Sequence, residues 1–181
     1  MKVLTILTNG FEEIEAIGTI AILRRGGVDL DIYSLHENEA TGRYGICIKN
    51  LNKFDEIDLN NYDFLLIPGG PQYQELEKTE KFLNIIKHFH DSNKFIAAIC
   101  AGPTILGHLG YLKGKKYTCF KSMNEDFGGT YIEDYAVRDD KLITGISAAG
   151  TIDFAFLILE AIKGKEIAEQ IKNQIYYYSK K

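Results

Sequence analysis

Residues 94–103, KFIAAICAGP, decide the fold class of this chain. The apolar run that ends at Ile99 has the length and composition of a strand buried on both faces. The small residues around Cys100 then allow an immediate turn into a helix. Two further apolar runs end at Thr8 and Ile67, and each leads into a turn that contains glycine. Because segments with helical spacing separate these runs, the pattern predicts an α/β fold with a mostly parallel sheet covered on both faces.

The same alternation extends along the whole chain, which shows no internal repeat, linker or low-complexity segment. We therefore expect a single domain over residues 1–181. The hydrophobic spacing predicts strands at 2–8, 28–34, 63–67, 94–99 and 117–120, and hairpins or edge strands at 41–49 and at 135–138 with 141–144. It predicts helices at 12–25, 74–90, 104–109, 151–162 and 165–178.

Composition excludes several classes of protein. Of the 181 residues, 45% are hydrophobic, and the net charge is −4, so no electrostatic footprint for nucleic acid or an anionic membrane surface is present. The three cysteines form no CxxC pair, which argues against a zinc site or a disulfide framework. The first residues lack a signal-peptide pattern, and no apolar stretch approaches the roughly 20 residues of a membrane span. We expect a cytoplasmic protein.

Common cofactor motifs are absent as well. The chain contains no GxGxxG, P-loop or HExxH sequence, which argues against nucleotide binding and zinc-protease chemistry. The expectation from the sequence is therefore a protein with no cofactor and no metal.

Cys100 is the first candidate for chemistry. Residues 98–102, AICAG, have the small-x-nucleophile-x-glycine form of a nucleophile elbow, with cysteine at the nucleophile position. Such a turn forces the nucleophile into a strained backbone conformation at the start of a helix, where the helix dipole favours a thiolate. The alternative is a buried cysteine at a strand end that acts only as a small hydrophobic residue.

Two neighbouring segments would complete a site of this kind. The Gly70 N–H and the Ala101 N–H would form an oxyanion hole, although a Pro-Gly-Gly sequence is more often a simple tight turn. Glu15 is followed by apolar residues, and an inward position near a thiolate would raise its pKa through burial and keep a proton available. The alternative for an acidic residue in a first helical turn is a solvated partner of the helix dipole.

Three motifs in order identify a resemblance: GFEEIE at 10–15, LIPGG at 66–70 and AAICAGP at 97–103. Together they closely resemble the ThiJ/PfpI superfamily, and within it the branch of the Parkinson-associated protein deglycase (DJ-one-like). The resemblance covers nearly the whole chain. It implies a flavodoxin-like three-layer sandwich, a homodimer, Cys100 as an oxidisable nucleophile and Glu15 as its protonated carboxyl partner. It also implies Gly70 and Ala101 as the oxyanion donors.

This chain departs from the family pattern at three places. Ala101 occupies the position of the histidine that follows the cysteine in the intracellular peptidase branch, which removes the base of a Cys-His mechanism and disfavours proteolysis. Phe120 aligns with a histidine that approaches the cysteine in the deglycase branch. Residues 147–151, SAAGT, stand where that branch has Arg-Gly-Pro-Gly-Thr, so Ser147 replaces a basic residue and Ala149 a rigid one.

The sequence therefore supports two functions of different classes. The first is a cofactor-free, cysteine-dependent glyoxalase or deglycase that acts on small reactive dicarbonyls or their glycated adducts. The second is a redox sensor or chaperone-like stress protein that responds through oxidation of Cys100.

Overall fold

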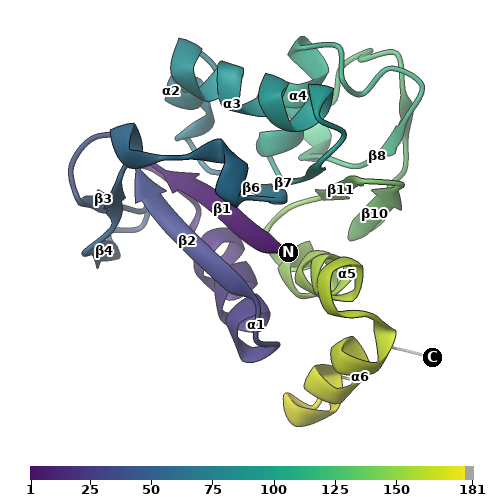
Figure 1. The fold of residues 1–181 in the computed structure, drawn as a ribbon. Helices are drawn as coiled ribbons and strands as arrows, with labels where there is room; N and C mark the ends of the chain where they lie inside the picture. Colours follow the sequence, from purple (N-terminus) through teal and green to yellow (C-terminus); the bar gives the residue numbers. More distant parts are fainter. Residues whose placement is uncertain (178–181) are drawn as a thin grey trace.

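A seven-stranded sheet forms the centre of the protein in this computed structural model, which describes residues 1–177 (Figure 1). Its strands lie in the order β10-β11-β7-β6-β1-β2-β5, and every neighbouring pair is parallel except β10 and β11. The strands are β1 (Lys2–Leu7), β2 (Asp29–Ser34), β5 (Asn52–Lys53), β6 (Phe64–Ile67), β7 (Phe95–Ile99), β10 (Ala136–Asp139) and β11 (Leu142–Gly145).

Helices cover both faces of this sheet. Figure 1 shows α2, α3 and α4 on one side, and α1, α5 and α6 on the other. Side chains alternate along the central strands, so Leu65 packs into the core beneath the first group and Leu66 into the core beneath the second. The helices are α1 (Thr19–Arg25), α2 (Tyr73–Leu76), α3 (Glu80–Asp91), α4 (Gly102–His108), α5 (Thr151–Lys163) and α6 (Lys165–Gln174). The predicted α/β fold with a mostly parallel sheet between two helical layers is confirmed.

Shorter elements lie outside the main sheet. Two two-stranded sheets pair β3 (Glu39–Thr41) with β4 (Cys47–Lys49), and β8 (Lys116–Tyr117) with β9 (Thr130–Tyr131). The first is the hairpin expected at 41–49, with Thr41 opposite Cys47. The remaining single turns are η1 (Ile14–Gly18), η2 (Phe54–Glu56), η3 (Leu59–Asn61), η4 (Lys121–Met123) and η5 (Ala148–Gly150).

The predicted single helix at 74–90 is wrong, because the chain turns between α2 and α3. Thr79 adopts an extended backbone before α3, and its hydroxyl donates to the Glu75 carbonyl at 2.9 Å. This contact closes the end of α2 with a side chain. Leu76 and Phe82 on either side of the turn are both buried, so the hydrophobic spacing alone resembles one continuous helix.

The predicted strand at 117–120 is also wrong beyond Tyr117. The Thr118 N–H donates to the Thr144 hydroxyl at 2.9 Å, and the Phe120 N–H donates to the Cys100 carbonyl at 2.9 Å. The main chain at Thr118 and Phe120 thus bonds to a side chain and to a turn, and not to a neighbouring strand. The last helix ends at Gln174, and the end predicted for it, residue 178, lies outside the described residues.

Candidate active site

The loops that follow β1, β6 and β7 meet at one edge of the sheet. These three strands are neighbours in the sheet order and run in the same direction, so their carboxyl ends lie side by side. Strand order reverses at β1, which pairs with β2 on one side and β6 on the other. Ligand sites of open α/β sheets form at such a point.

Cys100 occupies the turn between β7 and α4 with a φ of 63°, the left-handed conformation expected of a nucleophile elbow. Both of its main-chain groups are bonded: its N–H donates to the Gly145 carbonyl at 2.9 Å, and its carbonyl accepts from Phe120. A β-carbon at position 102 would lie 2.8 Å from the Ile67 carbonyl oxygen, so glycine is required there. The surrounding contacts thus hold the strained backbone of Cys100 in place.

Glu15 lies in η1, a wide π-type turn at the start of the first helical segment, and its side chain is only 1% exposed. Such turns occur often at functional sites because they redirect a side chain from the regular helical position. The Glu15 carboxyl hydrogen-bonds the Cys100 thiol and accepts the Gly69 N–H at 3.0 Å. The Glu12 carboxylate accepts the Glu15 N–H at 2.8 Å and fixes the turn. The structure therefore brings Glu15 and Cys100 together.

Gly69 makes this close approach possible. A β-carbon at position 69 would lie 2.5 Å from the Glu15 Oε2 atom and 2.7 Å from the Cys100 Cβ atom. Both distances are shorter than any normal van der Waals contact. A side chain here would separate the carboxyl from the sulfur.

Two main-chain donors face the sulfur. The N–H groups of Gly70 and Ala101 both hydrogen-bond Cys100, which places the two predicted oxyanion donors on the same side of the site. Gly70 has a φ of 88°, and a β-carbon there would lie 2.5 Å from the Glu12 nitrogen. Position 70 therefore requires glycine for both its conformation and the space around it.

Burial decides the protonation of the Glu15–Cys100 pair. Burial, together with the charge of Glu12, raises the pKa of Glu15 from 4.5 to about 7. Burial also raises the pKa of Cys100, and the charge of Glu15 raises it further, against the smaller opposite effect of the Ala101 and Gly70 N–H groups. The expectation that the helix start would dominate and favour a free thiolate is therefore wrong. Instead, the two groups retain a proton between them near neutral pH.

A cavity of about 420 Å³ opens above this pair. Phe120 lines this cavity, near Cys100 as the family resemblance implied, and is 43% exposed. Sequence reasoning did not find Arg43 and Tyr44, which reach the cavity from the turn between β3 and β4. No local pattern marks these two residues, because only the packing of the hairpin brings them to the site. The lining residues are Glu12, Glu15, Arg43, Tyr44, Gly70, Pro71, Tyr73, Gln74, Cys100, Ala101, Phe120, Met123, Ser147 and Ala148.

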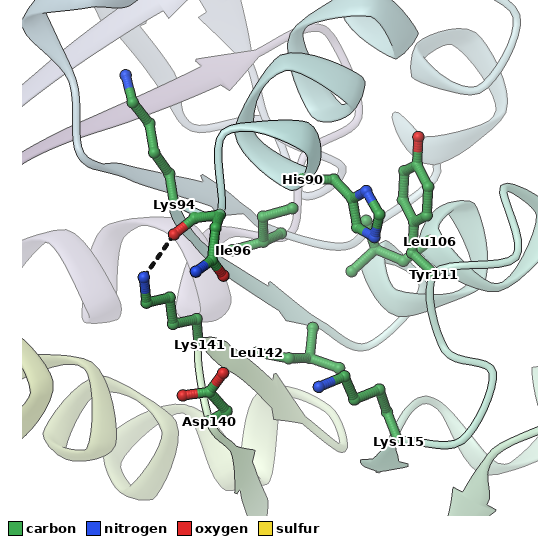
Figure 2. A pocket seen from close by; sticks show the side chains of 10 residues that line it. His90, Lys94, Ile96, Leu106, Tyr111, Lys115, Asp140, Lys141 and Leu142 are labelled. Atoms are coloured by element: carbon green, nitrogen blue, oxygen red, sulfur yellow. Dashed lines mark hydrogen bonds between the residues drawn. The ribbon is translucent and has the colours of Figure 1, made fainter.

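A second pocket, of about 130 Å³, lies near the amino ends of β7 and β11 (Figure 2). Its lysines already have partners: Lys94 donates to the Leu59 and Tyr62 carbonyls, and Lys141 donates to the Asn93 carbonyl at 2.6 Å. In Figure 2 the Lys94 side chain points away from the other lining residues. The third lysine of the lining, Lys115, pairs with Asp139 at 3.9 Å, so all three lysines of this pocket have partners.

Within residues 1–177, no group of three or more His, Cys, Asp or Glu side chains is placed to hold a metal ion. None of the helices described is both long and apolar enough to cross a membrane.

Comparisons with known proteins agree with this architecture. The model of the DJ-1/PfpI family matches residues 1–161. Deglycase TK1284 of Thermococcus kodakarensis is 31% identical over 147 residues, which are 80% of this chain and 89% of that protein. The structure of oxidized Toxoplasma gondii DJ-1 superposes with a TM-score of 0.89 at 28% identity, over 98% of this chain and 99% of that one. The structure of Drosophila melanogaster DJ-1beta superposes with a TM-score of 0.90 at 26% identity, over 99% of this chain and 100% of that one.

The raised pKa of Glu15 predicts a pH-dependent stability. The folded state binds the Glu15 proton up to about pH 7, whereas the unfolded state releases it near pH 4.5, so stability falls as the pH rises through this window. The free energy of unfolding of the wild type should therefore fall by about 3 kcal/mol relative to Glu15→Gln between pH 4.5 and 8. Urea unfolding of both proteins across this range measures the difference. A difference that stays constant with pH contradicts the shifted pKa.

A Gly69→Ala substitution should uncouple the pair. The new methyl group must displace the Glu15 carboxyl or Cys100, so we expect a loss of about 1–3 kcal/mol in stability from overpacking. The pH profile of Cys100 alkylation by iodoacetamide should then match that of Glu15→Gln. A wild-type profile in Gly69→Ala would show that the hydrogen bond does not depend on this glycine.

Proposed function

Because this chain belongs to the DJ-1/PfpI family, we propose that it is a cofactor-free, cysteine-dependent enzyme of the glyoxalase or deglycase type. Its substrates would be reactive α-oxo aldehydes such as methylglyoxal, or their early adducts with proteins. One observation carries the proposal: a buried carboxyl that retains a proton near pH 7 hydrogen-bonds a cysteine thiol beside two main-chain N–H groups and an open cavity. That TK1284 is named a deglycase supports the same substrate class.

The first step forms a carbon–sulfur bond. The Cys100 sulfur attacks the aldehyde carbon, and the carbonyl oxygen becomes an oxyanion that accepts hydrogen bonds from the Gly70 and Ala101 N–H groups. In the form that reacts, Glu15 is ionised and the Cys100 thiol holds its proton; this proton passes to the substrate oxygen as the sulfur attacks, which leaves Glu15 as a carboxylate. The product is a hemithioacetal, and the pair has given up its shared proton.

The second step moves a proton between two adjacent carbons. The Glu15 carboxylate removes the proton from the former aldehyde carbon, which generates an enediolate, and returns it to the neighbouring carbon. The hydroxyl proton on the former aldehyde carbon passes to the neighbouring ketone oxygen in the same step, so the former aldehyde carbon becomes a thioester and the neighbouring ketone becomes an alcohol. One carbon is oxidised and the other reduced, so no external oxidant or reductant is needed.

Hydrolysis completes the cycle. Water attacks the thioester carbonyl, whose oxygen again accepts bonds from the same two N–H groups. The carbon–sulfur bond breaks, the thiol regains its proton, and a 2-hydroxy acid leaves. Phe120 lines the cavity and contributes no proton carrier to this step, and the sequence resemblance aligns it with a histidine of the deglycase branch. We therefore expect slow turnover.

The rival function is redox sensing through Cys100. A peroxide would transfer one oxygen atom to the thiolate to form a sulfenate, and a second peroxide would form a sulfinate, with water released at each step. Protonated Glu15 could donate a hydrogen bond to one sulfinate oxygen. The observation that favours this function is the apolar Phe120 in the cavity. The related Toxoplasma gondii structure is described as oxidized.

We further propose that residues 1–181 form one domain and that two copies associate. Ile14 in η1 and Ile152 in α5 are 58% and 41% exposed, and they offer apolar surface for such a contact. Sedimentation equilibrium of the full chain would measure the mass of the assembly.

Substitution of Glu15 separates the enzyme from the sensor. In a reaction with methylglyoxal and no glutathione, Glu15→Gln and Cys100→Ser should each abolish lactate formation, because the first lacks the proton carrier and the second the nucleophile. Cys47→Ser should retain wild-type activity, since Cys47 is exposed on β4 and does not line the cavity.

Equal lactate formation by the wild type and Cys100→Ser would refute the proposal of a cysteine-dependent enzyme. Formation of Cys100 sulfinate by peroxide, followed by mass spectrometry of the same proteins, would then test the sensor. Glu15→Gln should still form the Cys100 sulfinate, because the glutamine amide can also donate a hydrogen bond to a sulfinate oxygen.

A further inference from the structure

Arg43 is the one cationic side chain among the described residues that line the active-site cavity. It is exposed, and its guanidinium lies 5.0 Å from the centre of the Tyr44 ring. Within residues 1–177 no ion pair joins it to a carboxylate. A cation that has an aromatic support and no anionic partner is available to a ligand.

The turn that carries Arg43 is held by a buried carboxylate. Glu13 is 6% exposed, and its Oε1 atom accepts the Tyr44 N–H at 2.7 Å and the Ile46 N–H at 3.5 Å. The Arg43 N–H itself donates to the Phe11 carbonyl at 2.9 Å. These contacts tie the turn to the loop after β1, which also leads into Glu15. The main chain at Arg43 is therefore held in place relative to the reacting pair.

The two carboxyl groups that line the cavity, those of Glu12 and Glu15, are buried, whereas Arg43 is exposed. Glu12 is 7% exposed, and its carboxylate is occupied by the Glu15 N–H. Glu15 retains a proton up to about pH 7. An incoming anion therefore meets Arg43 at the exposed mouth of the cavity. Since the whole chain carries a net charge of −4, any preference for anions must arise from this local contact.

We infer that Arg43 determines substrate specificity by binding a carboxylate at the end of the substrate remote from its aldehyde. This inference deepens the proposed function and, as a statement about substrates, rests on it. The guanidinium forms two parallel hydrogen bonds with a carboxylate. The cavity of about 420 Å³ also has room for an acidic tail beyond a three-carbon substrate, since sites of roughly 300 Å³ or more hold far larger ligands. The preferred substrate is thus an acidic α-oxo aldehyde.

Two alkylating reagents of nearly equal size test the charge preference without any turnover. Iodoacetate is anionic and iodoacetamide is neutral, and in a Cys47→Ser background, which removes the exposed thiol on β4, mass spectrometry follows the reaction of both reagents with the Cys100 sulfur. The ratio of their second-order rate constants should fall about three- to tenfold in Arg43→Gln, because the anionic reagent loses its partner. The rate with iodoacetamide should stay within about twofold of the wild type, which also reports any change in the thiol itself.

Lys49→Gln is the matched control. It removes one positive charge from the same hairpin, but Lys49 lies outside the cavity and pairs with Glu39. Its ratio should equal that of the wild type. An unchanged ratio in Arg43→Gln, or an equal fall in Lys49→Gln, would overturn the inference.

Turnover extends the test to substrates. The ratio of kcat/KM for 4,5-dioxopentanoate to that for methylglyoxal should exceed one in the wild type and fall about three- to tenfold in Arg43→Gln. If neither compound is turned over but the alkylation ratio responds as expected, the proposed function fails and anion recognition by Arg43 stands. If both are turned over but neither ratio responds, the role of Arg43 fails and the enzyme stands.

Glu13 is the positioning residue of this arrangement. Glu13→Ala leaves the turn without its acceptor, so the alkylation ratio should fall as in Arg43→Gln. Glu13→Gln keeps an acceptor oxygen and should restore the wild-type ratio. A wild-type ratio in a folded Glu13→Ala protein would overturn this positioning role.

Discussion

The hydrogen bond between the Glu15 carboxyl and the Cys100 thiol requires three loops to meet at one edge of the sheet. Each loop follows one of three adjacent parallel strands, β1, β6 and β7, so the sheet order itself sets their separation. The wide turn η1 then directs Glu15 inward, and the left-handed turn at Cys100 directs the sulfur toward it. Gly69 leaves no side chain between the two groups, and Gly70 leaves room for the loop that follows β1. The sheet, the turns and the glycines are thus all needed for one shared proton.

The chemistry follows from the environment of that proton. In water the Glu15 carboxyl would be ionised and the Cys100 thiol neutral near pH 7. Burial raises the pKa of both groups, so Glu15 also stays protonated up to about pH 7, and the pair can deliver a proton to a substrate oxygen or a hydrogen bond to an oxidised sulfur. The same geometry therefore serves either a dicarbonyl enzyme or a redox sensor. Phe120 adds no titratable group, and Arg43 adds the one cation among the described lining residues.

Sequence reasoning predicted the parts of this site that follow directly from strand ends. Cys100 and Gly70 come immediately after apolar runs, and parallel strands bring such positions together. The inward orientation of Glu15 needed the resemblance to a family, because an acidic first turn usually faces solvent. The direction of the Cys100 pKa could not be predicted, since a sequence shows the helix start but not the burial. Arg43 was missed because hydrogen bonds to Glu13, 30 or more residues away, place its turn at the cavity.

The most direct test of the account is the protonation state of Glu15 itself. Carbon-13 NMR of the side-chain carboxyl, assigned by comparison with Glu15→Gln, follows its titration in the folded wild type. We predict that Glu15 is still largely protonated at pH 6 and titrates with a pKa of about 7. A carboxyl that is already ionised at pH 5 would contradict the shared proton, and with it the chemistry that depends on the pair.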